Sequence, residues 1–477
     1  MSGAAGTIQD GRGGRTPLSH DRCAAWPEVL GDRGYRPYEP DSDDTGRVYR
    51  HASEPVPAKL TLLGRQGSAA SEVLEVMEHT TSDSRWSNEG RIQRLLCSLT
   101  IQSLLILLAT RLLLFGASWF TLGVMPRLPL YPAQLPDTFL PETRWLDGWA
   151  RWDTSHYVTI ALHGYGGDGN LSHDGGLGFF PLFPLLMRGL VTLSGLEPTE
   201  GRLALAAIVI ACACIAVAVP VFAHLVNRRF GADVARTAVV LLCVSPFSYF
   251  FSAGYSESLF LLLVVLAFAF ADRRWWIPAA IIAALATSSR LAGLALPPAL
   301  LLLAWRREAS IRDMIGITLI SPLGAATFVG YTWWRFDDPL AYFHAQQHWG
   351  GWREHVGDYL TLFTQHPKEA LLGDPRNQII VLNVVLLVLW LASLPWVWRL
   401  LDPGIALFTT LIVVAHGVMT WVSLGRYLLP AIGFYIVAAL LLTQPGWRAG
   451  PRDIVVVGST MLLTMLTILF GHGFWTI

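Results

Sequence analysis

The chain has 477 residues, of which 53% are hydrophobic and 15% charged, and its 35 basic residues balance 35 acidic ones. A net charge of zero gives no indication of a nucleic-acid partner, and we expect none. Long apolar runs exclude an ordinary soluble protein, because a helix needs roughly 20 apolar residues to cross a bilayer. The charges cluster in residues 1–95 and in short links between apolar runs. An unpaired charge at bilayer depth costs about 3 kcal/mol, which explains that distribution.

The lysine and cysteine contents give two further indications about the source of the protein and the kinds of site it can have. Lys59 and Lys368 are the only lysines, so nearly every basic residue is Arg, which is typical of a GC-rich bacterial genome. The five cysteines lie in the polar amino-terminal arm or in apolar runs. We therefore expect neither a disulfide framework nor a cysteine-based metal site.

The amino-terminal segment differs from the rest of the chain. Residues 1–90 are rich in Gly, Asp, Arg, Ser and Pro, and they lack the short apolar core of a signal peptide. They are predicted to form a mostly disordered cytoplasmic arm, with a short helix around SAASEVLEVMEH. Residues 91–477 then form the membrane domain.

The first apolar run, residues 99–120, follows Arg91 and Arg94, which places the amino terminus inside by the positive-inside rule. Residues 121–200 become a large outer loop. Within it, residues 179–195 are too short and proline-rich for a full span, so they are predicted to form a helix at the outer interface.

The remaining apolar runs alternate across the membrane. With about eleven spans in total, every link with several Arg residues lies inside, and a second long loop, residues 335–376, lies outside. The fold class predicted is an all-α integral membrane bundle. Its later spans are 203–226, 234–251, 257–271, 276–289, 291–305, 314–334, 378–398, 404–422, 428–443 and 454–475.

The residues most suited to catalysis lie in the predicted first outer loop. Residues 145–184 are polar, aromatic and Gly-rich, with Asp153 directly after Trp152. A carboxylate at a membrane surface suits an enzyme that deprotonates a hydroxyl beside a lipid anchor. We find neither a Gly-rich phosphate loop nor an acidic pair for a metal-bound diphosphate, so a nucleotide sugar is not expected as donor. A sugar on a lipid phosphate needs no such domain.

A lipid-phosphate donor requires cations for the leaving group and aromatic faces for the sugar. Arg290 and Arg426 are the leading cations, with Arg335 and Arg202 as further choices. The aromatic residues of the outer loops are Trp145, Trp149, Trp152, His156, Tyr157, Trp349 and Trp352. Each has a structural alternative: an outer Asp is often only solvated, Trp and Tyr anchor membrane interfaces, and Arg snorkels from helix ends.

Five segments in this order carry a family resemblance: RWDTSHY, FFPLFPLL, SPFSYFFSAGYSESLF, TSSRLAG and GRYLLPA. Together they resemble the PIG-V family of mannosyltransferases, and the resemblance covers about residues 95–475. It implies a GT-C type fold of many spans. It also implies an inverting transfer of mannose from a polyprenyl or dolichyl phosphate.

The resemblance assigns roles to residues of this chain. Asp153 corresponds to the expected base, and the YSES segment places Tyr255 and Glu257 at the outer mouth of a helix hairpin. Together with the aromatic residues and cations above, the predicted substrate-binding residues are Trp152, His156, Tyr157, Tyr255, Glu257, Arg290, Arg426 and Tyr427. Glu257 has an alternative as a capping or pairing carboxylate at a helix start. Solvated loops are expected for Asp168, Asp174, Asp337 and Asp338, and His416 is expected to be a hydrogen-bonded packing residue.

The chain departs from the family in its long polar arm and its bacterial composition. Eukaryotic members act on a GPI precursor in the endoplasmic reticulum, so that acceptor does not carry over. We expect a multi-pass protein of the bacterial plasma membrane, or of the endoplasmic reticulum if the chain is eukaryotic. Its partners would be a lipid-phosphate-linked sugar donor, a lipid or glycan acceptor and membrane lipids.

The sequence thus predicts a membrane glycosyltransferase that moves mannose to an acceptor hydroxyl at the outer face. No metal or other cofactor is expected, since Arg binds a monophosphate leaving group in two-point fashion. The alternative is a transporter or lipid flippase, which usually shows repeated hydrophobic segments and ionisable residues at broken helices near the midplane. Here the ionisable residues gather at helix ends and in one outer loop.

Overall fold

The computed structural model describes residues 98–127, 138–166, 176–347, 352–373, 375–419, 423–447 and 450–474. The chain divides into two units, residues 1–74 and 75–477, and all described residues lie in the second. Every element in these ranges is helical, which confirms the predicted all-α class. The predicted amino-terminal arm and its short helix lie outside the described residues.

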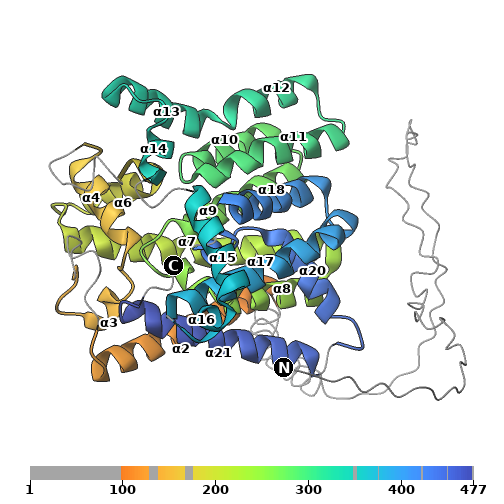
Figure 1. Ribbon diagram of the computed structural model, residues 1–477. Helices are drawn as coiled ribbons and strands as arrows, with labels where there is room; N and C mark the ends of the chain where they lie inside the picture. The colour runs from red at the N-terminus through yellow and green to blue at the C-terminus, as the bar shows by residue number, and fades with distance from the viewer. Residues whose placement is uncertain are drawn as a thin grey trace, which may run out of the picture. The chain divides into compact units, whose positions relative to one another are not determined.

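Figure 1 labels most of the α-helices. The α-helices are α2 (Leu99–Val124), α3 (Arg144–Asp147), α4 (Asp153–His163), α6 (Leu182–Leu193), α7 (Glu200–Phe230), α8 (Ala232–Val244), α9 (Glu257–Asp272), α10 (Trp276–Thr287), α11 (Leu296–Arg306), α12 (Ile311–Ile320), α13 (Leu323–Phe336), α14 (Ala341–Gln347), α15 (Trp352–Gln365), α16 (Pro367–Leu372), α17 (Pro375–Leu400), α18 (Pro403–Met419), α19 (Leu424–Tyr427), α20 (Ile432–Leu442) and α21 (Pro451–Gly471). Three 3₁₀ helices join them: η1 (Gly176–Gly178), η2 (Ser248–Phe251) and η3 (Leu291–Ala295).

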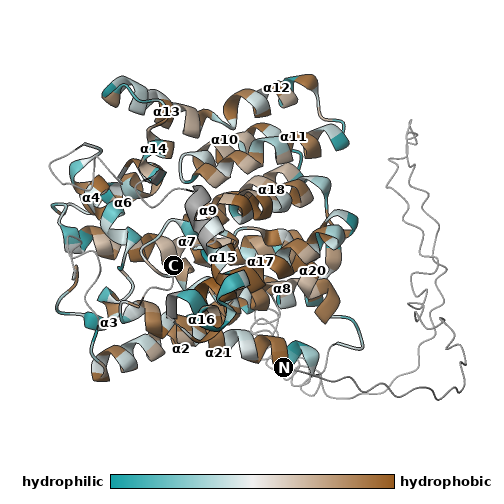
Figure 2. Ribbon diagram, in the orientation of Figure 1, coloured by the Kyte–Doolittle hydropathy of each residue, from teal (hydrophilic) through white to brown (hydrophobic). Residues whose placement is uncertain are grey.

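Five helical segments are long and apolar enough to cross a membrane by length and composition: α2, α7, α12 with α13, α17 and α21. Shorter apolar helices accompany them, namely α6, α10, η3 with α11, α18 and α20. Figure 2 shows hydrophobic residues along these helices and hydrophilic ones in the links and at helix ends. The multi-span class is thereby confirmed, whereas the count of about eleven spans stays a prediction.

Two predicted boundaries are corrected, and one predicted span contains a break. The span predicted over 234–251 ends at Val244, because Ser245 precedes a proline and is extended, with φ −52° and ψ 137°. The span predicted over 314–334 lies within Ile311–Phe336, which is long and apolar enough to cross a membrane, but it consists of two helices, since Pro322 has no N–H with which to continue the ladder of α12. The interfacial helix predicted over 179–195 exists as α6 but begins only at Leu182, after Pro181.

Helix α7 lies at the centre of the packing. It contacts α2, α4, α6, α8 and α9, and its buried alanines, Ala207, Ala211 and Ala218 among them, allow neighbouring helices to approach closely. With 31 residues, its two ends lie about 45 Å apart. Its start follows α6, in the predicted outer loop, and its end carries Arg228 and Arg229.

At that second end, charges from four helices meet. Arg228 pairs with Asp272 at the end of α9 at 2.9 Å, and Arg229 pairs with Asp402 before α18. Arg307, after α11, lies 3.4 Å from Asp272 and 3.3 Å from Asp402. Four links predicted to lie inside are therefore neighbours in space, as a common membrane side requires.

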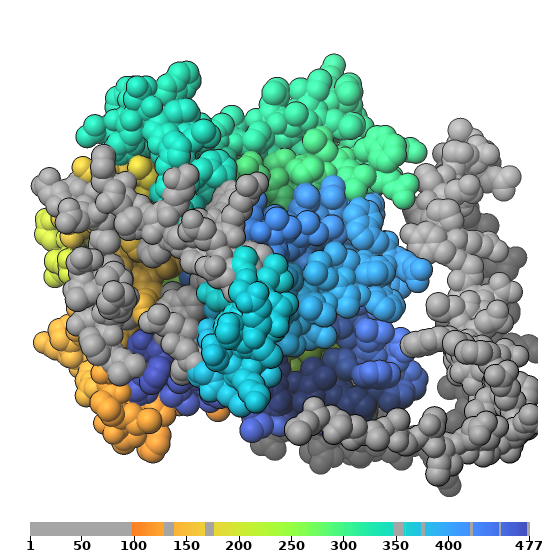
Figure 3. Space-filling model, in the orientation of Figure 1, coloured from red at the N-terminus to blue at the C-terminus, as the bar shows by residue number. Residues whose placement is uncertain are grey.

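Helices α13 and α14 pack against the predicted first outer loop. Leu177 in η1 packs with Ala341 and Ala345 of α14, and Phe180 packs with Ala325 and Phe328 of α13. Figure 3 shows atoms of the α13 and α14 region beside those of the first outer loop. Segments far apart in the sequence thus enclose the polar region that the sequence singled out.

Candidate functional site

The start of α4 fixes the position of Asp153. The preceding residue, Trp152, has φ 52° and ψ −113°, an unfavourable backbone conformation for a bulky side chain. The Asp153 N–H donates to the Tyr255 hydroxyl at 3.2 Å, and that hydroxyl donates to the Arg151 carbonyl at 3.0 Å. Strain of this kind persists where surrounding contacts over-determine it, as often happens at functional sites.

A close backbone approach joins α4 to the segment before α9. Thr154 Oγ1 donates to the Gly254 carbonyl at 3.1 Å, and the Gly254 N–H donates to the Trp149 carbonyl at 2.9 Å. A Cβ at position 254 would lie 2.9 Å from Thr154 Cγ2 and 3.2 Å from Ala207 Cβ. Only glycine fits here without displacement, so the Gly254 position sets how closely Tyr255 approaches Asp153.

Four charged side chains then form one alternating chain. Asp153 Oδ2 lies 2.7 Å from Arg426 Nη1, and Arg426 Nε lies 3.1 Å from Glu257 Oε1. The same Glu257 oxygen lies 2.7 Å from Arg290 Nη1. The side chains are 16%, 5%, 2% and 16% exposed in the order Asp153, Arg426, Glu257, Arg290. Two acids balance two bases, which makes burial of all four tolerable.

Aromatic rings surround Arg426. Its guanidinium carbon lies 5.3 Å from the ring centre of Phe250, 5.2 Å from that of Tyr255 and 4.8 Å from that of Tyr427. Its Nη2 donates to the Tyr427 hydroxyl at 3.0 Å. The ring of Tyr427 also faces Arg290, at 5.3 Å. Cation–π contacts of this kind stabilise a desolvated guanidinium.

The two arginines differ in the contacts they make. All three nitrogens of Arg426 face protein groups: Nη1 and Nη2 donate to Asp153 and Tyr427, and Nε lies within ion-pair distance of Glu257 Oε1 without a hydrogen bond. Arg290 uses Nη1 for both Glu257 Oε1 and Ser256 Oγ, at 2.7 and 3.1 Å. Among the described residues nothing bonds to its Nε or Nη2. Arg290 therefore has the donors still open to a ligand.

Two further polar atoms at the site are buried and unbonded. Glu257 Oε2 and Trp152 Nε1 have no hydrogen-bond partner among the described residues. A buried acceptor or a buried donor that is left without a hydrogen bond costs about 1–3 kcal/mol. They are the atoms that a polar ligand such as a sugar would satisfy.

Tyr157 and His156 follow Asp153 on α4. The Tyr157 hydroxyl lies 2.9 Å from Ser256 Oγ, and burial raises the pKa of Tyr157, so its phenol stays protonated. The ring of His156 stacks on Phe179 at 4.7 Å. His156 is thus held in the packing of the loop, beside the charged chain rather than within it.

The structure places the other predicted residues away from the four charges. Trp145 and Trp149 pack on Phe115 of α2, which favours a packing role for both. Arg202 donates to the Glu197 carbonyl at 2.8 Å, and Arg335 lies over Phe336. Trp349 and the side chain of Trp352 lie outside what the structure describes.

The remaining predicted acids and His416 have ordinary contacts. Asp337 is exposed, and Asp338 accepts from the Leu340 N–H at 2.9 Å. Asp168 and Asp174 lie outside the described residues. His416 Nδ1 lies 2.9 Å from the Ile412 carbonyl, which confirms a hydrogen-bonded packing residue, and its ring lies beside Tyr427.

Sequence reasoning missed one acid in the first outer loop. Asp147 is fully buried and accepts from the N–H groups of Phe139 and Leu140, at 2.7 and 2.8 Å, while it pairs with Arg127. All its contacts close the loop on itself. Its position in the WLDGW run offered no signal to separate it from a solvated acid.

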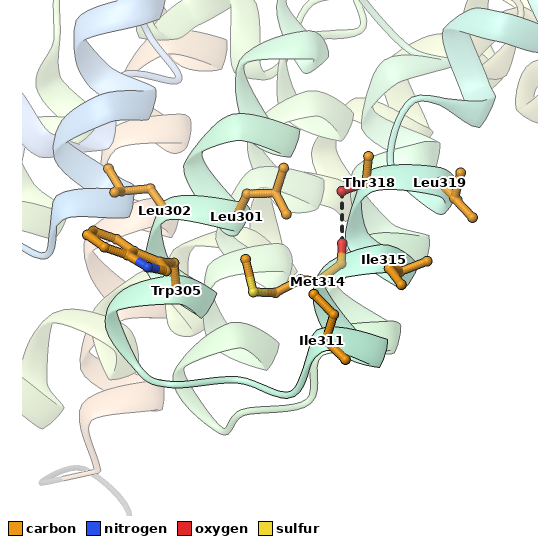
Figure 4. Close-up of a pocket in the computed structure, with 8 residues that line it drawn as sticks. All are labelled: Leu301, Leu302, Trp305, Ile311, Met314, Ile315, Thr318 and Leu319. Carbon is orange, nitrogen blue, oxygen red and sulfur yellow. Dashed lines mark hydrogen bonds between the residues drawn. The ribbon is translucent and has the colours of Figure 1, made fainter.

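Two hollows lie outside the charged chain. One, of about 400 Å³, lies between α4, α6 and α13 and is lined by Tyr165, Arg188, Phe328 and Tyr331 among others. The other, of about 630 Å³, lies between α11 and α12 (Figure 4), and its lining from Leu301 to Leu319 is almost wholly apolar. Among the described residues no three His, Cys, Asp or Glu side chains gather in a set that could hold a metal ion.

Comparison with known proteins places this geometry in context. Residues 97–297 match the family Mannosyltransferase (PIG-V), which confirms the resemblance for the first four of the five ordered motifs. GPI alpha-1,6-mannosyltransferase 2 of Mus musculus is 34% identical over 139 residues, 28% of this chain and 27% of the relative. The Homo sapiens protein of that name is 34% identical over 157 residues, 31% of this chain and 30% of the relative. The matched segments span less than a third of these relatives.

Solved structures are similar over more of the chain at lower identity. ArnT from Cupriavidus metallidurans bound to undecaprenyl phosphate is 14% identical, with 77% of this chain and 76% of that chain covered and a TM-score of 0.42. The oligosaccharyltransferase of Archaeoglobus fulgidus in its apo form is 13% identical, with 80% and 56% covered and a TM-score of 0.44.

Proposed function

We propose that this chain, whose residues 97–297 match the PIG-V mannosyltransferase family, is a membrane glycosyltransferase. It transfers mannose from a polyprenyl-phosphate donor to a hydroxyl of a lipid or glycan acceptor at the outer face, with inversion. The observation that carries the proposal is the alternating chain Asp153–Arg426–Glu257–Arg290. Three separated motifs, RWD, YSES and TSSR, lie within the matched segment and converge there with GRY from beyond it.

Asp153 acts as the general base. Its Oδ2 is held by Arg426, while Oδ1 has no protein bond in the described part of the chain. The acceptor hydroxyl gives its proton to Oδ1 as its oxygen bonds to the anomeric carbon. The bond from that carbon to the phosphate oxygen breaks on the opposite face, which inverts the anomeric centre.

Arg290 receives the departing phosphate monoester. Its Nε and Nη2 are open, and a guanidinium offers two parallel N–H groups that match a phosphate. Glu257 and Ser256 hold its Nη1, so the fork is oriented before the donor arrives. Arg426 has a different role, because its nitrogens already face protein groups: it orients Asp153.

The sugar itself would occupy the space beside the two unbonded atoms. Glu257 Oε2 would accept a hydrogen bond from one sugar hydroxyl, and Trp152 Nε1 would donate a hydrogen bond to another. A site built to bond a hydroxyl rejects an analogue that lacks it, because its own buried groups are then left unpaired. This pair would therefore contribute to the choice of sugar.

The experiment incubates membranes that contain the protein with labelled polyprenyl phosphate mannose and identifies the labelled product. We expect a mannosylated lipid or glycan that is absent from membranes without the protein. Uptake of labelled sugar by proteoliposomes, with no transfer, would instead support a transporter and contradict the proposal.

A further inference from the structure

One charged residue of the membrane region takes no part in the proposed chemistry. Arg111 lies near the middle of α2, the single charged residue in a 26-residue helix that is long and apolar enough to cross a membrane. An unpaired charge at such depth costs about 3 kcal/mol even on insertion scales. Its side chain is 7% exposed, and no carboxylate in the described part of the chain pairs with it.

The guanidinium of Arg111 is bound by the break between α8 and η2. Nη1 donates to the Ser248 carbonyl at 2.8 Å and Nη2 to the Cys243 carbonyl at 3.2 Å. The hydroxyls of Ser248 and Ser252 lie within 3.4 Å of the same two nitrogens. One side chain on α2 thus reaches the acceptors of three residues on the neighbouring hairpin.

The break needs such a partner. The last carbonyls of a helix have no N–H partner within the helix, and in an apolar surrounding no water is present to replace it. Cys243 is next to the last residue of α8, and its carbonyl accepts from both Ser248 Oγ, at 2.7 Å, and Arg111 Nη2, while the Ser248 carbonyl accepts from Arg111 Nη1. A cation at a helix carboxyl end also interacts favourably with the helix dipole.

The segment that Arg111 holds is the one that carries the site. From η2 the chain runs through Phe250 and Tyr255, which face Arg426, to Ser256 and Glu257, which hold Arg290. Tyr255 also bonds to the Asp153 N–H. A shift of the hairpin would move the supports of the base and of both cations together.

We propose that Arg111 is a positioning residue of the active site: it replaces water at the broken α8–η2 backbone and so sets the position of Tyr255 and Glu257. It acts through the hairpin, since no residue of the four-charge chain bonds to Arg111 in the described part of the chain. Lys would keep the charge but not the fork that reaches the Cys243 and Ser248 carbonyls at once.

The test compares Arg111→Lys and Arg111→Met with Arg273→Met in the full-length protein purified in detergent micelles. Arg273 is a matched control, because it donates to the Ala269 carbonyl at the end of α9 but is exposed at the other end of the bundle. Hydrogen exchange is followed for peptides that cover residues 245–257. We expect faster exchange there in both Arg111 variants, with the protection of α7 and α17 kept and Arg273→Met unchanged.

An activity measurement completes the test and rests on the proposed function. Per folded, monodisperse protein, Arg111→Lys should lower kcat on the order of 100-fold, the cost of a misplacement of about 1 Å, with a smaller change in KM for the lipid-phosphate mannose donor. A merely stabilising residue would leave kcat per folded protein unchanged below the melting temperature.

Two results would overturn the inference: wild-type exchange over 245–257 in Arg111→Met, or loss of protection throughout the protein in Arg111→Lys. Failure of the proposed function looks different. A wild-type protein that transfers no mannose would contradict that function, while the exchange result would still decide the role of Arg111.

Discussion

At Asp153 one carboxylate has two tasks, since Oδ2 binds Arg426 and Oδ1 remains for the acceptor. Asp153→Asn keeps the shape of the side chain but removes its ability to take a proton. We expect turnover to fall on the order of 100- to 10,000-fold, with expression nearly unchanged, measured as the initial rate of mannose transfer at saturating donor. Asp338→Asn is the control, because Asp338 caps a turn in the second long loop. Transfer at a near wild-type rate in Asp153→Asn would contradict the role of Asp153 as the base. Glu257 would then be the residue to test.

Substitution of Arg290 and of Arg426 should change different kinetic constants, although both residues belong to the same row of ion pairs. Arg290→Lys loses the open fork that binds the phosphate both in the donor and as it departs, so we expect KM for the donor to rise and kcat/KM to fall on the order of 10- to 100-fold, the equivalent of about one lost charged hydrogen bond. Arg426→Lys mis-sets Asp153, so kcat should fall at least about 10-fold with a smaller change in KM. Equal rises in KM with kcat unchanged in both variants would show that Arg426 also binds the phosphate.

The junction between α4 and the hairpin before α9 depends on the absence of a side chain at Gly254. A Cβ there would lie 2.9 Å from Thr154 Cγ2, so Gly254→Ala should destabilise the protein by about 1–3 kcal/mol and reduce transfer. Adding Thr154→Ser removes that methyl group but keeps the hydroxyl, and should restore part of both losses. Melting temperature and rate are measured together.

Gly116 provides the control for that experiment. No atom lies within 4 Å of a Cβ built at Gly116 in α2, so Gly116→Ala should be neutral or stabilise by about 0.5–1 kcal/mol. Wild-type stability and rate in the Gly254→Ala protein would show that the close approach of the two backbones does not set the site.

The sequence predicts which segments carry the charged residues of the candidate site, but it does not predict which of these residues pair with one another. Asp153, Arg290 and Arg426 are candidates because charged groups at the ends of apolar runs are visible in a sequence, whereas Glu257 is a candidate through the resemblance of the YSES segment. Their pairing is not predicted, since Asp153 and Arg426 are 273 positions apart and periodicity gives a face without a partner. The sequence therefore treated the two arginines alike.

The breaks in the helices were missed for a related reason. Hydropathy continues through Pro246 and Pro322, so both runs read as single spans, whereas proline ends the hydrogen-bond ladder there. Arg111 was overlooked in the same way, as one charge within an apolar run. A lone charge at that depth is itself a signal that the helix faces a polar partner.

At the scale of the whole molecule, the proposed chemistry depends on which membrane side carries Asp153. The ends of α7 lie about 45 Å apart, with the loop of Asp153 before its start and the cluster of Arg228, Arg229 and Arg307 at its end. By the positive-inside rule we expect that cluster to be cytoplasmic, which would make the site face outward. A carrier-linked donor must then be presented on the outer side.

Cysteine labelling in intact cells measures this orientation. Glu142 and Arg306 are both exposed, one in the first long loop and one at the end of α11, and a chain whose five native cysteines are replaced by Ser or Ala carries one new cysteine at a time. Gly148 is less suitable, because a Cβ there would lie 2.6 Å from Leu122 Cδ1. We expect an impermeant maleimide to label Glu142→Cys at once, and Arg306→Cys only after permeabilisation. The reverse pattern would put Asp153 on the inner side, where a nucleotide sugar is available, and would remove the basis for an outer-face lipid-phosphate donor.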